Sequence, residues 1–146
     1  MQASPQISTV AHVIQLAVAP VFLFSGVAAL LGVLTNRLAR IIDRARALEV
    51  RAPAMGESER RDAHGELRHL SQRARLINWA ISLGTMCALS VCGVIVALFL
   101  GASLSIEVSG PVSVLFICSM LALFWALLCF LREIYVATKG LRIGPP

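Results

Sequence analysis

The 146-residue chain is 58% hydrophobic and only 14% charged, which lies far from the composition of a soluble domain. Aromatic residues make up 6%, so the excess consists of aliphatic and small side chains, the kind that lipid-facing helices use. The net charge of +5 would suit a nucleic-acid partner, but basic segments beside a membrane explain it more simply. We therefore expect a membrane protein with lipids, and no nucleic acid, as partners.

Three uncharged runs cover residues 13–34, 78–100 and 111–131, and each reaches the roughly 20 residues needed to cross hydrocarbon. They lack strict alternation, which favours helices over barrel strands. We expect the first run to be a retained helix and not a cleaved signal peptide, because residues 1–12 contain no lysine or arginine. We expect an all-α integral membrane protein in which residues 1–146 form a single membrane domain with three transmembrane helices.

The basic residues indicate the orientation. Residues 35–77 contain ten arginines, and the tail 132–146 contains the other three basic residues, Arg132, Lys139 and Arg142. The segments on the other side, 1–12 and 101–110, contain none. The positive-inside rule then predicts an outer N-terminus and a cytoplasmic C-terminus, as an odd number of spans requires.

The segment 35–77 predicts two helices with apolar seams. The first seam consists of Leu34, Leu38, Ile41, Ala45 and Leu48, and the second of Ala63, Leu67, Leu70, Ala74 and Ile77. Spacings of three and four residues are typical of helices that pack along a heptad seam. We expect an antiparallel helical hairpin in the cytoplasm, continuous with the first two spans.

The turn of this hairpin is predicted around Pro53 and Gly56, with Ser58 as the N-cap of the second helix. Glu66 is expected to approach Arg73 only loosely, so much positive charge stays uncompensated. This excess predicts a partner for the hairpin, either an acidic cytoplasmic protein or anionic lipid.

Four arginines should cluster at the base of the hairpin, where they would contact anionic lipid or a partner: Arg37, Arg40, Arg73 and Arg75. The alternative is a ring of guanidinium groups at the mouth of an oligomeric pore. Trp79 and Tyr135 are expected near the cytoplasmic interface of the membrane, where amphipathic rings prefer to lie.

The first span and its exit carry the candidate pore or interface residues, which are Gln15, Pro20, Ser25, Gly32, Thr35 and Asn36. Small residues form a stripe on each helix, which predicts close packing within the bundle or between protomers. The stripes consist of Ser25, Ala28, Ala29, Gly32, Asn36 and Ala39, then Ala80, Gly84 and Ala88, and finally Ser119, Ala122 and Ala126. A pore lining is the alternative function for such residues.

The residues that usually carry catalysis are missing from the expected arrangement. The four cysteines all fall within predicted spans and read as small apolar residues: Cys87, Cys92, Cys118 and Cys129. His64 and His69 lie five residues apart, a poor spacing for one helix face, and we interpret them as surface residues. No phosphate loop or pair of nucleophile and base occurs. We expect no catalytic residues, no metal, no cofactor and no enzyme activity.

Two stretches give the chain a family resemblance. Residues 15–23 (QLAVAPVFL) and 34–44 (LTNRLARIIDR) resemble a family of small bacterial membrane proteins classed as a domain of unknown function. The second stretch is the more specific, because polar residues directly at a membrane exit are not required for spanning lipid. The resemblance covers roughly residues 12–137 and implies a bacterial inner membrane and a three-helix layout.

Three functions fit these features. The first is a non-enzymatic protein that self-associates into a homo-oligomer through the small-residue stripes and the hairpin seams, and an oligomeric channel along the first helix is one form that it could take. The second is a membrane adaptor or regulatory subunit whose basic hairpin docks an acidic protein or anionic lipid. An intramembrane enzyme is the least favoured, since its spans would lack the necessary polar groups.

Overall fold

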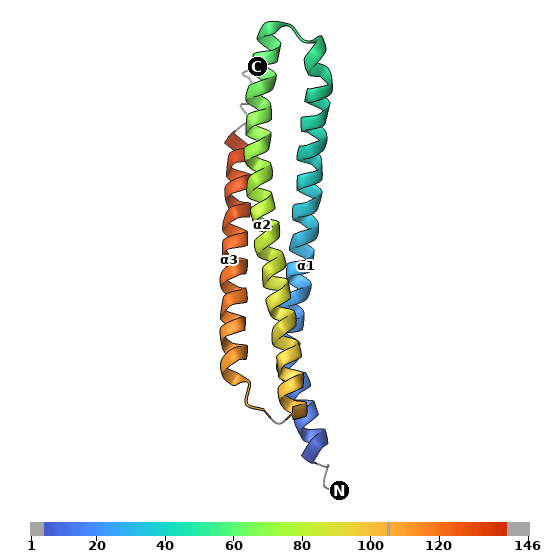
Figure 1. Ribbon diagram of the computed structural model, residues 1–146, viewed down its shortest axis with the longest axis vertical. Coiled ribbons are helices and arrows are strands. Elements are labelled where there is room, and N and C mark those ends of the chain that lie inside the picture. The colour runs from blue at the N-terminus through green and yellow to red at the C-terminus, as the bar shows by residue number, and fades with distance from the viewer. Residues whose placement is uncertain (1–4, 105, 140–146) are drawn as a thin grey trace. The chain divides into compact units, whose positions relative to one another are not determined.

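The computed structural model describes residues 5–104 and 106–139, with their side chains between residues 11 and 138. Over these described residues the chain is all-α, with three long helices and one short 3-10 helix (Figure 1). These are α1 (Pro5–Arg51), η1 (Ala52–Ala54), α2 (Glu57–Leu104) and α3 (Ser109–Lys139). The predicted fold class is confirmed in this respect.

Each long helix contains one of the three predicted uncharged runs, and each is long and apolar enough to cross a membrane. The runs 13–34 and 78–100 do not end their helices, because α1 and α2 continue through the arginine-rich segment without a break. Pro20 lies inside α1, where a missing backbone donor is tolerated in apolar helices.

The reversal between α1 and α2 lies where Pro53 and Gly56 predict it, but its cap differs from the prediction. Helix α2 begins at Glu57, and the backbone N–H of Arg60 donates to the carbonyl oxygen of Gly56 at 2.9 Å. The Glu59 carboxylate accepts from the Gly56 N–H at 3.3 Å, which is half of a capping box. Ser58 is therefore not the N-cap, because the helix has already started one residue earlier.

The helices contribute to two compact units, which are described separately. The first unit combines Met1–Leu31 with Leu83–Phe124. Its core is built on Val27, Cys87 and Val91, all essentially inaccessible to solvent. Gly84 permits close helix contact here, since a Cβ at this position would lie 3.0 Å from the Cδ2 atom of Leu31.

The second unit combines Gly32–Ser82 with Trp125–Pro146. Both predicted seams lie inward in this unit, since every seam residue is buried or half-buried. Leu34 and Ile77 are fully buried, and Ile41, Ala63 and Leu70 nearly so. The seam prediction is thus confirmed by burial, and it brings the arginine-rich parts of α1 and α2 against each other.

Candidate functional site

A buried carboxylate marks the centre of the second unit. Glu133 of α3 is fully inaccessible to solvent and accepts hydrogen bonds on both of its oxygen atoms. Arg37 of α1 donates from Nη1 to Oε2 at 2.6 Å, and Arg73 of α2 donates from Nη2 and Nε to Oε1 at 2.8 and 3.1 Å. We call these three residues the Glu133 cluster. It joins all three long helices through one side chain.

The cluster satisfies the physical conditions for burying charge. Breaking such a pair by removing one partner typically costs about 3–5 kcal/mol, because the remaining charge is left without compensation. Arg37 has a second contact, with its guanidinium carbon 5.2 Å from the centroid of the Phe130 ring, which adds a cation–π attraction. The two guanidinium groups hold one carboxylate, so the cluster keeps a formal charge of +1.

The cluster also lies at a defined level along the chain. Arg37 follows the first uncharged run by three residues, Arg73 precedes the second by five, and Glu133 follows the third by two. The three residues therefore lie just outside the same end of each uncharged run, and their contacts bring these three ends together within the second unit. A layer of paired charges is expected where apolar helix surface gives way to polar surroundings.

A second ion pair joins α1 and α2 in their arginine-rich segments, which we call the arms of the two helices. Arg44 of α1 and Glu66 of α2 approach to 2.6 Å between Nη2 and Oε1. The direct ion pairs are Arg44 with Glu66 and Arg73 with Glu133, while Glu66 and Arg73 line a common groove. Arg40 is exposed and lines a groove of about 340 Å³ together with Arg37 and Arg73.

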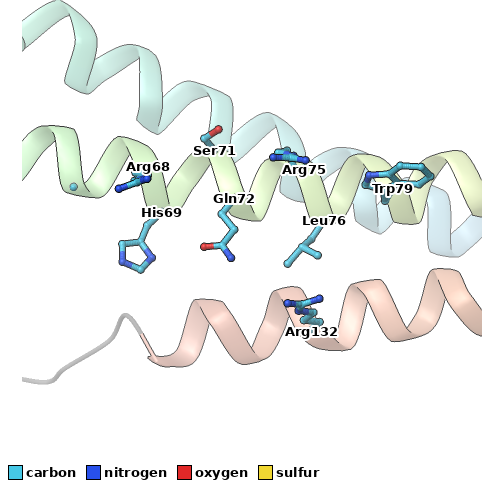
Figure 2. Close-up of a pocket in the computed structure, with 9 residues that line it drawn as sticks. Arg68, His69, Ser71, Gln72, Arg75, Leu76, Trp79 and Arg132 are labelled. Carbon is cyan, nitrogen blue, oxygen red and sulfur yellow. The ribbon is translucent and has the colours of Figure 1, made fainter.

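Arg75 belongs to a different surface, which we call the basic pocket. This pocket has a volume of about 750 Å³ and lies between α2 and α3. Its polar and aromatic lining comprises Arg68, His69, Ser71, Gln72, Arg75 and Trp79 of α2 and Arg132 of α3. Figure 2 shows His69, Gln72 and Leu76 extending from α2 toward α3, and Arg132 extending from α3 toward them. The four arginines predicted at the hairpin base thus divide between two surfaces.

The comparison with family models decides the family. A model described as "Protein of unknown function (DUF2721)" matches residues 17–143, which is most of the chain. The chain belongs to the DUF2721 family. No curated protein and no solved structure matches the chain significantly. The match includes the Glu133 cluster and the basic pocket, and the predicted resemblance is confirmed.

The small residues of α1 lie on the outside of this DUF2721 chain. In the first unit, Ser25 and Ala29 are exposed and lie two residues before and after buried Val27. Two residues correspond to about 200° around a helix, so they face away from the core. Ala28 is exposed as well. The Ser25 hydroxyl donates to the carbonyl oxygen of Val21 at 3.2 Å.

The second unit repeats this arrangement. Gly32 and Asn36 are exposed and flank the fully buried Leu34 at two residues on either side. A Cβ added at Gly32 would meet no atom within 4 Å. The Thr35 hydroxyl donates to the Gly32 carbonyl oxygen at 3.0 Å, and Ala39 is exposed. The α1 stripe therefore has a free face in both units of the DUF2721 chain.

The other two stripes pack inside the chain. On α2, Ala80 and Gly84 are buried, and on α3, Ser119 and Ala126 are fully buried. The Ser119 hydroxyl donates to the Phe116 carbonyl oxygen at 2.7 Å, which satisfies it without a partner from outside. Of the three stripes, the α1 stripe is the one that remains available to another molecule.

Glu133 is the residue that the sequence interpretation missed in the DUF2721 chain. The predicted orientation rests on the basic residues after the third run, and Glu133 is the one acid in residues 132–146. The signal was available, because a lone carboxylate two residues beyond an apolar run must find a partner when its helix is packed. Its partners, Arg37 and Arg73, were both among the candidate residues.

The remaining candidates do not form a chemical site in the part of the chain that the structure describes. Gln15 is exposed on α1, and Pro20 is buried. The four cysteines are free, with Cys87 in the core of the first unit. Among the described residues no group of His, Cys, Asp or Glu is placed to hold a metal ion. Arg142 lies outside the described residues, and so does the side chain of Lys139.

Proposed function

We propose that this chain is a non-enzymatic bacterial inner-membrane protein that self-associates through the small-residue stripe of α1. The N-terminus lies outside and the C-terminus in the cytoplasm, because all basic residues fall on one side of the three apolar helices. The arms of α1 and α2 around the Arg44–Glu66 pair then form a cytoplasmic hairpin. The Glu133 cluster lies at the inner end of the apolar runs in this arrangement.

The observation that carries self-association is the difference between the three stripes. The small residues of the α2 and α3 stripes are buried or half-buried within one chain, whereas those of the α1 stripe are exposed. Small side chains let helix backbones approach closely, and this is a main source of helix association in lipid. Asn36 adds a polar group on the same face, and its amide can bond across two copies.

A matched pair of glycine substitutions tests this interface. At both Gly26 and Gly32 an added Cβ would meet no atom within 4 Å, so leucine fits the single chain at either position. Gly32 lies on the stripe and Gly26 lies beside it. Gly32→Leu should weaken self-association at least about tenfold by holding the backbones apart, whereas Gly26→Leu should leave it unchanged.

The readout is the native mass of the full-length chain in lipid nanodiscs, with energy transfer between labelled copies in vesicles as a second measurement. Wild-type protein that remains monomeric in both would exclude the interface. Equal association of the two variants would exclude the stripe as its location. An oligomer with copies arranged around an axis would extend the proposal to a channel, because one three-helix chain cannot enclose a pore alone.

The adaptor function is favoured by a different observation. Arg46, Arg60 and Arg68 are exposed on the arms and make no ion pair among the described residues. The positive charge of these arginines would attract an acidic protein, and the association should weaken as the salt concentration is raised. Replacing Arg60, Arg61 and Arg68 by Glu should abolish binding of such a partner, and unchanged binding would rule out the adaptor function.

A further inference from the structure

The basic pocket combines three guanidinium groups without a carboxylate. Arg68, Arg75 and Arg132 are exposed and have no ion pair among the described residues, whereas Arg37 and Arg73 share Glu133. The pocket therefore gathers a formal charge of +3 from two helices. Arginine presents a planar fork of donors that matches phosphate geometry, so such a group is the ligand that this lining fits best.

The uncharged residues that line the basic pocket indicate which kind of phosphate-bearing molecule fits it. His69 and Gln72 extend into the space between α2 and α3, where they can add hydrogen bonds to phosphate or glycerol oxygens (Figure 2). Leu76 and the exposed ring of Trp79 continue the pocket toward the apolar run that starts at residue 78. The pocket is thus polar at one end and apolar at the other.

The position of the basic pocket relative to the uncharged runs agrees with its having one polar and one apolar end. Arg132 directly follows the third uncharged run, and Arg75 precedes the second run by three residues. Trp79 lies one residue inside that run, as is typical of rings at the headgroup level. Basic pockets between helices on the cytoplasmic side suit anionic headgroups, because the phosphate and the acyl chains each find matching surroundings.

We propose that the basic pocket binds the phosphate group of an anionic phospholipid, held by Arg75 and Arg132 with Arg68 at its polar end. Lipid recognition is thereby assigned to arginines other than Arg37 and Arg73, each of which already donates to Glu133. It rests on the membrane placement proposed above and is independent of self-association.

The test measures which lipids stay bound to the full-length chain. Wild type and variants are reconstituted with phosphatidylcholine and a minor share of phosphatidylglycerol, and retained lipids are identified by native mass spectrometry. Wild type should retain phosphatidylglycerol preferentially. The double variant Arg75→Gln with Arg132→Gln should weaken that retention at least about tenfold. Each of the two replacements removes one favourable electrostatic contribution to the binding of the anionic lipid.

The matched control is Arg46→Gln with Arg60→Gln, which removes the same charge from exposed arginines outside the pocket. This variant should retain phosphatidylglycerol like the wild type. Equal loss in both double variants would overturn the proposal, because bulk charge would then explain the retention. No preference for phosphatidylglycerol in the wild type would overturn it as well.

A competition arm separates a lipid from a free phosphate. Glycerol 3-phosphate and inorganic phosphate carry the charged group without acyl chains, and they should fail to displace phosphatidylglycerol from the wild type. Full displacement would overturn the assignment to a lipid. Carbonate extraction distinguishes the failures: a chain that stays in the membrane without lipid preference refutes the pocket alone, while a chain that leaves the membrane refutes the membrane placement too.

Discussion

Replacing Glu133 by Gln is the sharpest test of the site, because it removes one charge and almost no volume. The carboxylate accepts three hydrogen bonds from two arginines and is fully buried. Removing one partner of a buried ion pair costs about 3–5 kcal/mol. Arg37 and Arg73 keep 40% and 28% of their side chains exposed, so water compensates part of the loss. We expect a decrease of about 3 kcal/mol, or roughly a hundredfold in the unfolding equilibrium.

The assay is unfolding of the full-length chain in mixed micelles, followed by susceptibility to proteolysis as the share of denaturing detergent rises. Glu107→Gln is the matched control, since this exposed carboxylate accepts a single long hydrogen bond from Ser109 at 3.3 Å. The control should change the free energy of unfolding by less than about 0.5 kcal/mol. A Glu133→Gln protein as stable as this control would refute the reasoning.

A third variant separates charge from packing. Replacing Arg37, Arg73 and Glu133 together by Met removes every charge of the cluster and keeps similar volume. Because apolar replacement of a buried ionic group is often neutral or stabilising, most of the stability lost in Glu133→Gln should return. A triple variant as unstable as the single one would show that the cost comes from shape and not from uncompensated charge.

Two further predictions concern individual contacts. A double-mutant cycle on Arg44 and Glu66, measured by the same unfolding assay, should give a coupling of only about 0.2–1 kcal/mol, because both side chains are partly solvated; a coupling above about 2 kcal/mol would contradict the solvated geometry. Gly101→Ala should destabilise the connection between α2 and α3 by about 1–3 kcal/mol, since its Cβ would lie 2.5 Å from the Cγ2 atom of Val108. Thermal unfolding compared with Gly110→Ala, where a Cβ meets no atom within 4 Å, checks this, and equal midpoints would contradict it.

The helices were predictable because local patterns determine them. Uncharged runs of sufficient length and seams with three- and four-residue spacing depend only on neighbours along the chain, and burial of Leu34, Ile41 and Ile77 follows from them. The N-cap was predicted two residues too late, at Ser58 instead of Gly56. Ser58 is a good capping residue, but the Glu59 carboxylate binds the N–H of Gly56 and starts the helix earlier.

The site could be predicted only in part, because it depends on contacts between distant segments. Glu133 is separated from Arg37 by 96 positions and from Arg73 by 60, and no local pattern relates them. The pairing of Glu66 with Arg44 requires the register of two arms, which seam spacing alone does not determine. Likewise, a small-residue stripe on its own does not reveal whether it faces the bundle or its surroundings.

The order in which Arg37, Arg73 and Glu133 occur along the sequence has a consequence for folding. Arg37 and Arg73, which both donate to the carboxylate of Glu133, are synthesised before this residue, which follows them by 96 and 60 residues. Without α3 packed against α1 and α2, the two guanidinium groups would lack this shared counter-ion, and their mutual repulsion would oppose close approach of the two helices at this point. Packing of α3 therefore supplies the negative charge that α1 and α2 need between them, and we expect α1 and α2 to pack together less stably in a chain truncated before Glu133.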